Sequence, residues 1–90
     1  MIVEWDDRKA PANVRKHGVS FDEAVTALED LLSVTYRDPD HSEDEFRFLT
    51  FGLGSSGRIL VVAHADREEA IRLISARPAT RSERRAYEEG

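Results

Sequence analysis

Arginine is concentrated in the last quarter of this 90-residue sequence. Residues 71–87 contain five arginines and one acidic residue, Glu83, although the whole chain has a formal net charge of −5. The five are Arg72, Arg77, Arg81, Arg84 and Arg85. A guanidinium group presents a planar fork of N–H donors that matches a phosphate or a carboxylate. The cluster could therefore bind phosphate groups or an acidic partner.

The charge is uneven along the whole chain. Residues 1–66 carry seven Lys and Arg against thirteen Asp and Glu, a balance of −6, whereas residues 67–90 carry six Arg against five Glu, a balance of +1. Eleven of the thirteen basic residues are arginine. A GC-rich genome, which favours arginine codons, is an alternative explanation for arginine over lysine, but it does not explain the clustering.

Length and composition predict a single domain over residues 1–90, with 40% hydrophobic residues available for a core. The absence of cysteine removes disulfides, thiolate nucleophiles and zinc–thiolate sites, and it is compatible with a reducing cytosol. The first residues, MIVEWDDRK, lack the pattern of a signal peptide, and the longest apolar run, ILVVA, is too short to cross a bilayer. We therefore expect a soluble, cytoplasmic protein.

The elements that must position the arginines begin with a short strand, IVEW, and a helix that ends before Gly18. Asp6 is the expected N-cap of this helix. Pro11 would clash with the carbonyl four residues back if it lay beyond the first turn, so the regular helix should begin near Lys9 or one residue later. Gly18 is placed to take the left-handed conformation after the helix.

A second helix is predicted from the capping box SFDE, with Ser20 at the N-cap and Glu23 at N3. Apolar residues follow at spacings of three, four and seven, which predicts one buried face. These residues are Phe21, Ala24, Val25, Leu28, Leu31 and Leu32. The two helices, joined at Gly18 and Val19, should form a short hairpin.

A series of strands follows. The predicted strands are residues 32–36, 46–53, 58–65 and 70–76. The acidic stretch RDPDHSEDE is a loop, and GSSG and DREE are turns, so the last three strands should form an antiparallel meander. TRSE is a second capping box, with Thr80 and Glu83, and it opens a final helix. The expected fold class is α+β, a small antiparallel sheet flanked by helices in the order β-α-α-β-β-β-β-α.

Four blocks along the chain match the pattern of a known family. They are WDDRKAPANVRKHGVSF, DPDHSEDEFRF, GRILVVAHADR and IRLISARPATRSERRAYE. The last is the most specific, because a strand ending in IR-x-ISAR-x-A before a helix with ER-x-x-YE is hard to produce by chance. On these residues the chain resembles the BrnT family of toxins from type II toxin–antitoxin systems. Pro11 is a minor departure from the family pattern.

The resemblance implies a RelE-like fold and an endoribonuclease that cleaves RNA without metal or cofactor and inhibits translation. It also implies a BrnA-type antitoxin as partner, a helical DNA-binding protein that neutralises the toxin. The complex would repress its own operon, so the toxin would meet DNA only through the antitoxin. No membrane is involved in such a system.

Metal-free RNA cleavage needs a base for the 2′-hydroxyl proton, a cation to stabilise the phosphorane and an acid for the leaving 5′-oxygen. The candidate catalytic residues are Arg67, Arg77, His64, Glu83 and Tyr87. The candidate RNA-binding residues are Arg72, Arg81, Lys16 and His17. The arginines could form a cradle for one or two phosphates, although Arg67 and Arg77 reach one phosphate only if the sheet twists or the hairpin folds back.

Five of the candidates have a structural alternative. His64 could be a core or edge histidine, Glu83 a helix cap, and Tyr87 a packing residue of the final helix. Lys16 and His17 suit the C-terminal end of a helix dipole. The choice between base and acid stays open at this point.

Other functions are also possible on the same residues. No metal site is predicted at His41 and its acidic neighbours, because metal ligands must converge and these are merely adjacent. The arginine cluster would equally serve a non-catalytic binding module. An inactivated toxin that acts only through its DNA-binding antitoxin would have the same sequence features.

Overall fold

The structure, a computed structural model, describes residues 1–38 and 46–90. Its elements are β1 (Ile2–Glu4), α1 (Lys9–His17), α2 (Phe21–Leu28), β2 (Val34–Arg37), β3 (Arg47–Leu53), β4 (Ile59–Arg67), β5 (Ala70–Pro78) and α3 (Arg81–Glu89). This order confirms the predicted α+β succession of strands and helices. Within the described residues, no helix is long and apolar enough to cross a membrane.

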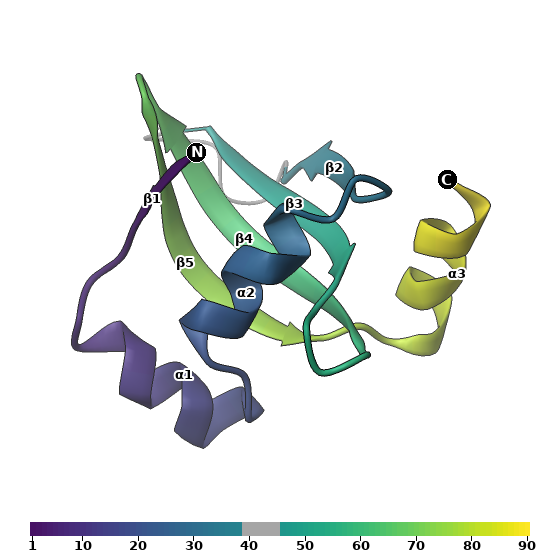
Figure 1. Cartoon of the computed structure of the whole chain (residues 1–90), viewed down its shortest axis with the longest axis horizontal. Helices are drawn as coiled ribbons and strands as arrows, with labels where there is room; N and C mark the ends of the chain where they lie inside the picture. Colours follow the sequence, from purple (N-terminus) through teal and green to yellow (C-terminus); the bar gives the residue numbers. More distant parts are fainter. Residues whose placement is uncertain (39–45) are drawn as a thin grey trace.

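The five strands form one sheet in the order β1-β5-β4-β3-β2 (Figure 1). Strands β3 to β5 form the predicted antiparallel meander, and β2 extends it by pairing antiparallel with β3. β1 instead pairs in parallel with β5, with Ile2 opposite Ala70 and Glu4 opposite Arg72. The sheet is thus mostly antiparallel, as predicted, and the pair at this edge is the parallel exception within the described residues. No hairpin joins β1 to β5, so no tight turn imposes an antiparallel direction on this pair.

Helices α1 and α2 cover one face of the sheet, and α3 stands apart from them (Figure 1). The main core lies under α1 and α2. Its buried residues are Val19, Phe21, Ala24, Ala27, Leu60, Val62, Leu73 and Ala76. Gly52 of β3 allows the close approach of α2, because a Cβ at this position would lie 2.1 Å from the carbonyl oxygen of Ala27. Any larger residue there would push α2 away from the sheet.

α1 begins at Lys9, but its N-cap is Arg8 and not the predicted Asp6. Asp6 instead accepts hydrogen bonds from the backbone N–H of Arg8 (2.8 Å) and from its guanidinium group (3.0 Å), within the turn that precedes the helix. Pro11 is the third helical residue, in the first turn, where its missing N–H removes no intrahelical bond. Gly18 has a φ of 70°, which confirms the left-handed end of α1.

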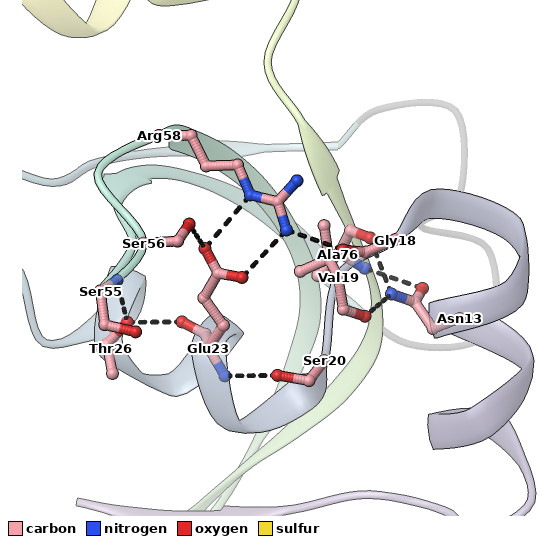
Figure 2. A network of polar contacts seen from close by, with 10 residues as sticks. All are labelled: Asn13, Gly18, Val19, Ser20, Glu23, Thr26, Ser55, Ser56, Arg58 and Ala76. Atoms are coloured by element: carbon pink, nitrogen blue, oxygen red, sulfur yellow. Dashed lines mark hydrogen bonds and ion pairs between the residues drawn. The ribbon is translucent and has the colours of Figure 1, made fainter.

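Asn13 of α1 binds the open edge of β5 (Figure 2). Its amide nitrogen donates to the carbonyl oxygens of Ala76 (2.8 Å) and Val19 (2.9 Å). Its amide oxygen accepts from the backbone N–H of Ala76 (3.1 Å). The side chain is buried, so all three bonds replace water that the fold excludes. Asn13 thus takes the place of a neighbouring strand at this edge.

The N-terminus of α2 is bound to the turn between β3 and β4 (Figure 2). Ser20 caps the helix as predicted, and its Oγ accepts from the backbone N–H of Glu23 (3.1 Å). The Glu23 carboxylate does not complete the predicted capping box. It accepts instead from Arg58 (3.0 Å) and from the hydroxyl of Ser56. The Arg58 guanidinium holds the pKa of Glu23 below its usual value, so the pair is charged and joins helix to turn.

α2 ends at Leu28, earlier than the apolar spacing predicted. The prediction that Leu31 and Leu32 continue the buried face is wrong, because their exposures are 98% and 73%. The cause is a turn at Asp30. Its Oδ1 accepts from the backbone N–H of Leu32 (3.0 Å), and its carbonyl oxygen accepts from Ser33 (3.0 Å). The chain leaves the helix there and directs both leucines into solvent.

α3 packs on the opposite face of the sheet, which we call the α3 face. A second, smaller core lies under this helix. It contains buried Phe51, Val61 and Ala79, with Leu49, Ile59, Ala86 and Tyr87 packed against them. The predicted capping box of α3 is present, with Thr80 accepting from the backbone of Glu83 and Glu83 accepting from the backbone of Thr80.

Candidate functional site

Arg72 and Arg77 of β5 lie on the same face of the sheet. They are five positions apart, so in a regular strand they would point to opposite faces. The register between β4 and β5 shifts at Ile74, which has no partner on β4, and this β-bulge reverses the alternation. Arg77 is opposite Val61 and Arg72 is opposite Ala65. Since Val61 packs under α3, both arginines belong to the α3 face.

A row of cross-strand neighbours crosses this face. It runs from Arg47 on β3 through Ala65 on β4 and Arg72 on β5 to Glu4 on β1. Ala65 is only 1% exposed, and Arg47 and Arg72 on either side of it are partly buried. The apolar stems of the two arginines therefore lie along the sheet, as long basic side chains commonly do.

Arg67, the last residue of β4, extends the same face towards the β4–β5 hairpin. It lines a shallow depression together with Arg72 and three residues of the β1 end. The lining residues are Glu4, Trp5, Asp6, Arg67 and Arg72. The hydrogen-bonded Arg8 holds the pKa of Asp6 at about 2. The depression thus has a fixed negative charge beside its two guanidinium groups, which weakens its attraction for phosphate.

Arg77 is held by Glu83 of α3. Nη1 of Arg77 donates to Oε1 (2.7 Å) and Nη2 donates to Oε2 (2.9 Å), a bidentate ion pair. This pair lowers the pKa of Glu83 to about 2 and raises the pKa of Arg77. A carboxylate with so low a pKa is a weak proton acceptor at neutral pH. Glu83 is therefore suited to fixing the guanidinium group, which is itself partly exposed.

The arginines of the α3 face form two groups. Arg47, Arg67 and Arg72, which we call the hairpin arginines, lie towards the β4–β5 hairpin, and Arg77 lies at the other end of β5. Arg67 is opposite Ala70, seven positions before Arg77, which is a distance of roughly 20 Å along the strand. The structure therefore does not bring Arg67 and Arg77 to one phosphate. It offers two separate places on one face.

Tyr87 serves as an anchor of α3. Its hydroxyl group donates to Oδ2 of Asp30 (2.5 Å), and its ring packs in the small core beside Phe51. The contact raises the pKa of Tyr87 and lowers the pKa of Asp30. Glu83 and Tyr87 share one side of α3, but they contact different partners, at the end of β5 and at the end of α2.

His64 lies on the face that α1 and α2 cover. It is 3% exposed and stacks on Phe48. Its Nε2 is 2.7 Å from Oγ1 of Thr50, and its Nδ1 is 2.8 Å from Oδ1 of Asp66. Its partner on β5, Leu73, belongs to the main core. The sheet therefore separates His64 from the arginines of the α3 face.

The remaining candidates are dispersed. Lys16 and His17 end α1, on the side of the sheet opposite α3. Arg81 is the exposed first residue of α3 and lines a shallow depression with Arg85. His41 lies outside the described residues, and the described residues contain no group of ligands able to hold a metal ion.

Two residues of the α3 face were missed by reasoning from sequence. Arg47 joins the hairpin arginines across Ala65. Tyr36 of β2 is opposite Leu49, is 45% exposed, and its ring lies 5.3 Å from that of Phe51. The alternation in RFLTF places Arg47 on the same face as Phe51, which was a usable signal. Tyr36 could be added only once the pairing of β2 with β3 was known.

Comparisons with known proteins bear on the family and the fold of the chain. The family model described as "Ribonuclease toxin, BrnT, of type II toxin-antitoxin system" matches residues 5–83. The crystal structure of the ribonuclease toxin BrnT of Brucella abortus is 25% identical in sequence, with a TM-score of 0.66, covering 90% of this chain and 99% of that one. No curated protein sequence matches the chain. The family match extends over most of the sequence, and the chain therefore belongs to the BrnT family of type II toxin–antitoxin systems.

Proposed function

We propose that this protein is an endoribonuclease toxin that cleaves RNA without a metal ion and inhibits translation in the cytoplasm. One observation carries the proposal. In a chain of a ribonuclease-toxin family, Arg67, Arg72 and Arg77 lie on the one sheet face that α1 and α2 do not cover. In the part of the chain that the structure describes, the other face carries the main core under α1 and α2.

RNA binding on this face would use charge and stacking together. The hairpin arginines would contact one phosphate and Arg77 another further along the backbone, each through charge-assisted hydrogen bonds. Tyr36 offers a partly exposed ring near Arg47, on which a base can stack. Arg81 would extend the surface onto α3. Lys16 and His17 would contact RNA only where it passes round the edge of the sheet.

In the proposed reaction, the 2′-hydroxyl oxygen attacks the adjacent phosphorus and the bond to the 5′-oxygen breaks. The products are a 2′,3′-cyclic phosphate and a 5′-hydroxyl group. Arg77 would stabilise the charge of the phosphorane, with Glu83 as the residue that positions it. Tyr87 would position α3. His64 would support the β3–β4 pairing from the face that α1 and α2 cover. Glu83, Tyr87 and His64 are engaged in other contacts. Water would therefore take the proton of the 2′-hydroxyl group and supply the proton for the leaving 5′-oxygen.

The test is cleavage of a defined oligoribonucleotide by purified protein in the presence of a chelator. We expect wild-type protein to cut it, Arg77→Ala to lose at least tenfold in rate, and a substrate with 2′-deoxyribose at the cleavage site to stay intact. Arg15→Ala, an exposed arginine of α1 on the other side of the sheet, is the matched control. Equal cutting by Arg77→Ala and wild type would remove Arg77 from the site. Absence of cutting by wild type, with RNA alone and in a translation extract, would reject the function.

A second candidate function is binding without catalysis. It is favoured by the engagement of the acid–base candidates, since Glu83 is paired with Arg77, Tyr87 with Asp30, and His64 is buried behind the sheet. The protein would then be a binding module or an inactivated toxin that acts only through its antitoxin. Growth arrest on expression without the antitoxin separates the two functions, because a purely binding protein should be harmless.

The proposed partner is a BrnA-type antitoxin. Membership of a type II toxin–antitoxin family implies an antitoxin that binds this chain directly. We propose that it is a helical DNA-binding protein and that this chain reaches the operator DNA only through it.

A further inference from the structure

The turn between α2 and β2 presents an apolar surface to solvent. Leu31 is 98% exposed and Leu32 is 73% exposed. Leu53 of β3 is 45% exposed, and its backbone N–H donates to Oδ2 of Asp30 (2.9 Å). We call these three residues the leucine patch. Grouped exposed leucines on a small acidic domain are typical of a surface that binds another protein.

The leucine patch is held in place by hydrogen bonds around Asp30. Its carboxylate accepts from the backbone of Leu32, from the backbone of Leu53 and from the hydroxyl of Tyr87. One side chain therefore connects the α2–β2 turn, the end of β3 and the last turn of α3. An apolar surface on such a connected turn is already ordered before a partner binds, which reduces the entropy lost on association.

The rim of the leucine patch is negative. α2 and α3 both end beside it, since Asp30 follows the end of α2 and contacts the last turn of α3 (Figure 1). Neither helix has a basic residue in its last turn, so the negative ends of two helix dipoles lack compensation there. Four acidic residues lie at these two helix ends, namely Glu29, Asp30, Glu88 and Glu89. The segment from 22 to 36 contains no Lys or Arg.

We propose that the leucine patch is the docking surface for a basic, amphipathic segment of the antitoxin. Apolar side chains of that segment would cover the three leucines, and its Lys and Arg residues would face the acidic rim. The inference rests on the antitoxin partner of the proposed function, and it is independent of ribonuclease activity. A second copy of this chain fits less well, because two acidic rims would meet in a protein of net charge −5.

The test compares two substitutions at one exposed position. Leu31→Lys and Leu31→Glu both remove the apolar contact, but only the lysine opposes a basic partner. Binding is measured by titration calorimetry with the antitoxin protein encoded beside the gene of this chain. We expect Leu31→Lys to weaken binding at least tenfold and Leu31→Glu to weaken it less. Val14→Lys, at a 47% exposed position of α1, is the matched control and should bind as wild type.

The other outcomes would overturn the proposal. Unchanged affinity of Leu31→Lys would show that the antitoxin docks elsewhere, and a larger loss for Leu31→Glu would show that the partner segment is not basic. Sedimentation of the free proteins tests self-association: a wild-type dimer that Leu31→Lys dissociates, with antitoxin affinity unchanged, would assign the surface to a second copy. RNA cleavage by free Leu31→Lys should equal wild type. A wild-type protein that cuts no RNA would reject the proposed function and leave this comparison valid.

Discussion

Both carboxylate oxygens of Glu83 accept a hydrogen bond from the guanidinium group of Arg77, at 2.7 Å and 2.9 Å. Oε1 of Glu83 also accepts from the backbone N–H of Thr80 at 2.8 Å. One carboxylate therefore caps α3 and fixes the direction of the arginine that ends β5. The direction of the Arg77 side chain and the stability of α3 are therefore coupled through Glu83.

This coupling predicts a pH-dependent loss of stability for Glu83→Gln. The pKa of Glu83 is lowered from 4.5 to about 2, so its stabilisation is fully present above pH 4.5 and is lost as the pH falls through about 2. At neutral pH we expect the substitution to reduce the free energy of unfolding by about 1 kcal/mol, as for a partly exposed bidentate pair. Urea unfolding measures the difference. If the difference in free energy of unfolding between Glu83→Gln and wild type stayed the same as the pH fell to about 2, the stabilising role of the charged Glu83 would be contradicted.

RNA affinity should depend on Arg72 and not on Arg15. Arg72 lies in the row of the α3 face, whereas Arg15 is exposed on α1. For Arg72→Ala we expect weaker binding to single-stranded RNA and a salt dependence of log K that is lower by about 0.7, as for the loss of one phosphate contact. Fluorescence anisotropy at several salt concentrations provides both values. Identical slopes for Arg72→Ala and Arg15→Ala would remove Arg72 from the RNA surface.

The contact between Tyr87 and Asp30 should be measurable as a coupling energy. We expect the double-mutant cycle of Tyr87→Phe and Asp30→Asn to give about 1 kcal/mol at neutral pH, because the bond links a hydroxyl to a charged group at the surface. The pKa of Asp30 is lowered and that of Tyr87 is raised. The coupling should therefore decrease as the pH falls below 3.8 or rises above 10, the usual values of the two groups. Additive single effects at neutral pH would show that α3 is held by packing alone.

Local signals predicted most of the fold. The caps at Ser20 and Thr80 and the left-handed Gly18 depend on bonds within a few residues, so the sequence contains the necessary information. The apolar spacing of α2 extends to Leu31 and Leu32, but the helix itself ends before them. Their spacing is helical, yet Asp30 forms a turn with Leu32 and Ser33. Contacts of Asp30 with β3 and α3, which are distant in the sequence, hold this turn in place.

The candidate site was harder to predict, because its geometry depends on the register of the sheet. The bulge at Ile74 places Arg72 on the face of Arg77, and strict alternation would have placed it opposite. Regular alternation along β4 places His64 on the face of the sheet that α1 and α2 cover. This placement could be predicted only once that covered face was known. The sequence therefore names candidate residues, but the register of the sheet decides which of them share a face.

The last prediction concerns Gly52 and Gly57, two positions that require glycine for different reasons. Gly52 lies in β3 against α2, where an added Cβ would be 2.1 Å from the carbonyl oxygen of Ala27. Gly57 lies in the β3–β4 turn with a φ of 91° and open space around it. We expect Gly57→Ala to cost about 1 kcal/mol through backbone strain alone. Gly52→Ala should cost about 3 kcal/mol, because backbone atoms must move apart.

Urea unfolding of the two variants separates these causes. A displaced α2 would also move Asp30, which follows the helix and holds Tyr87 of α3. Gly52→Ala should therefore reduce the Tyr87–Asp30 coupling energy as well as the stability, whereas Gly57→Ala should leave that coupling at its wild-type value. Equal costs for the two substitutions would mean that the contact between Gly52 and Ala27 relaxes without moving the helix, and that the position of α2 does not govern the anchoring of α3.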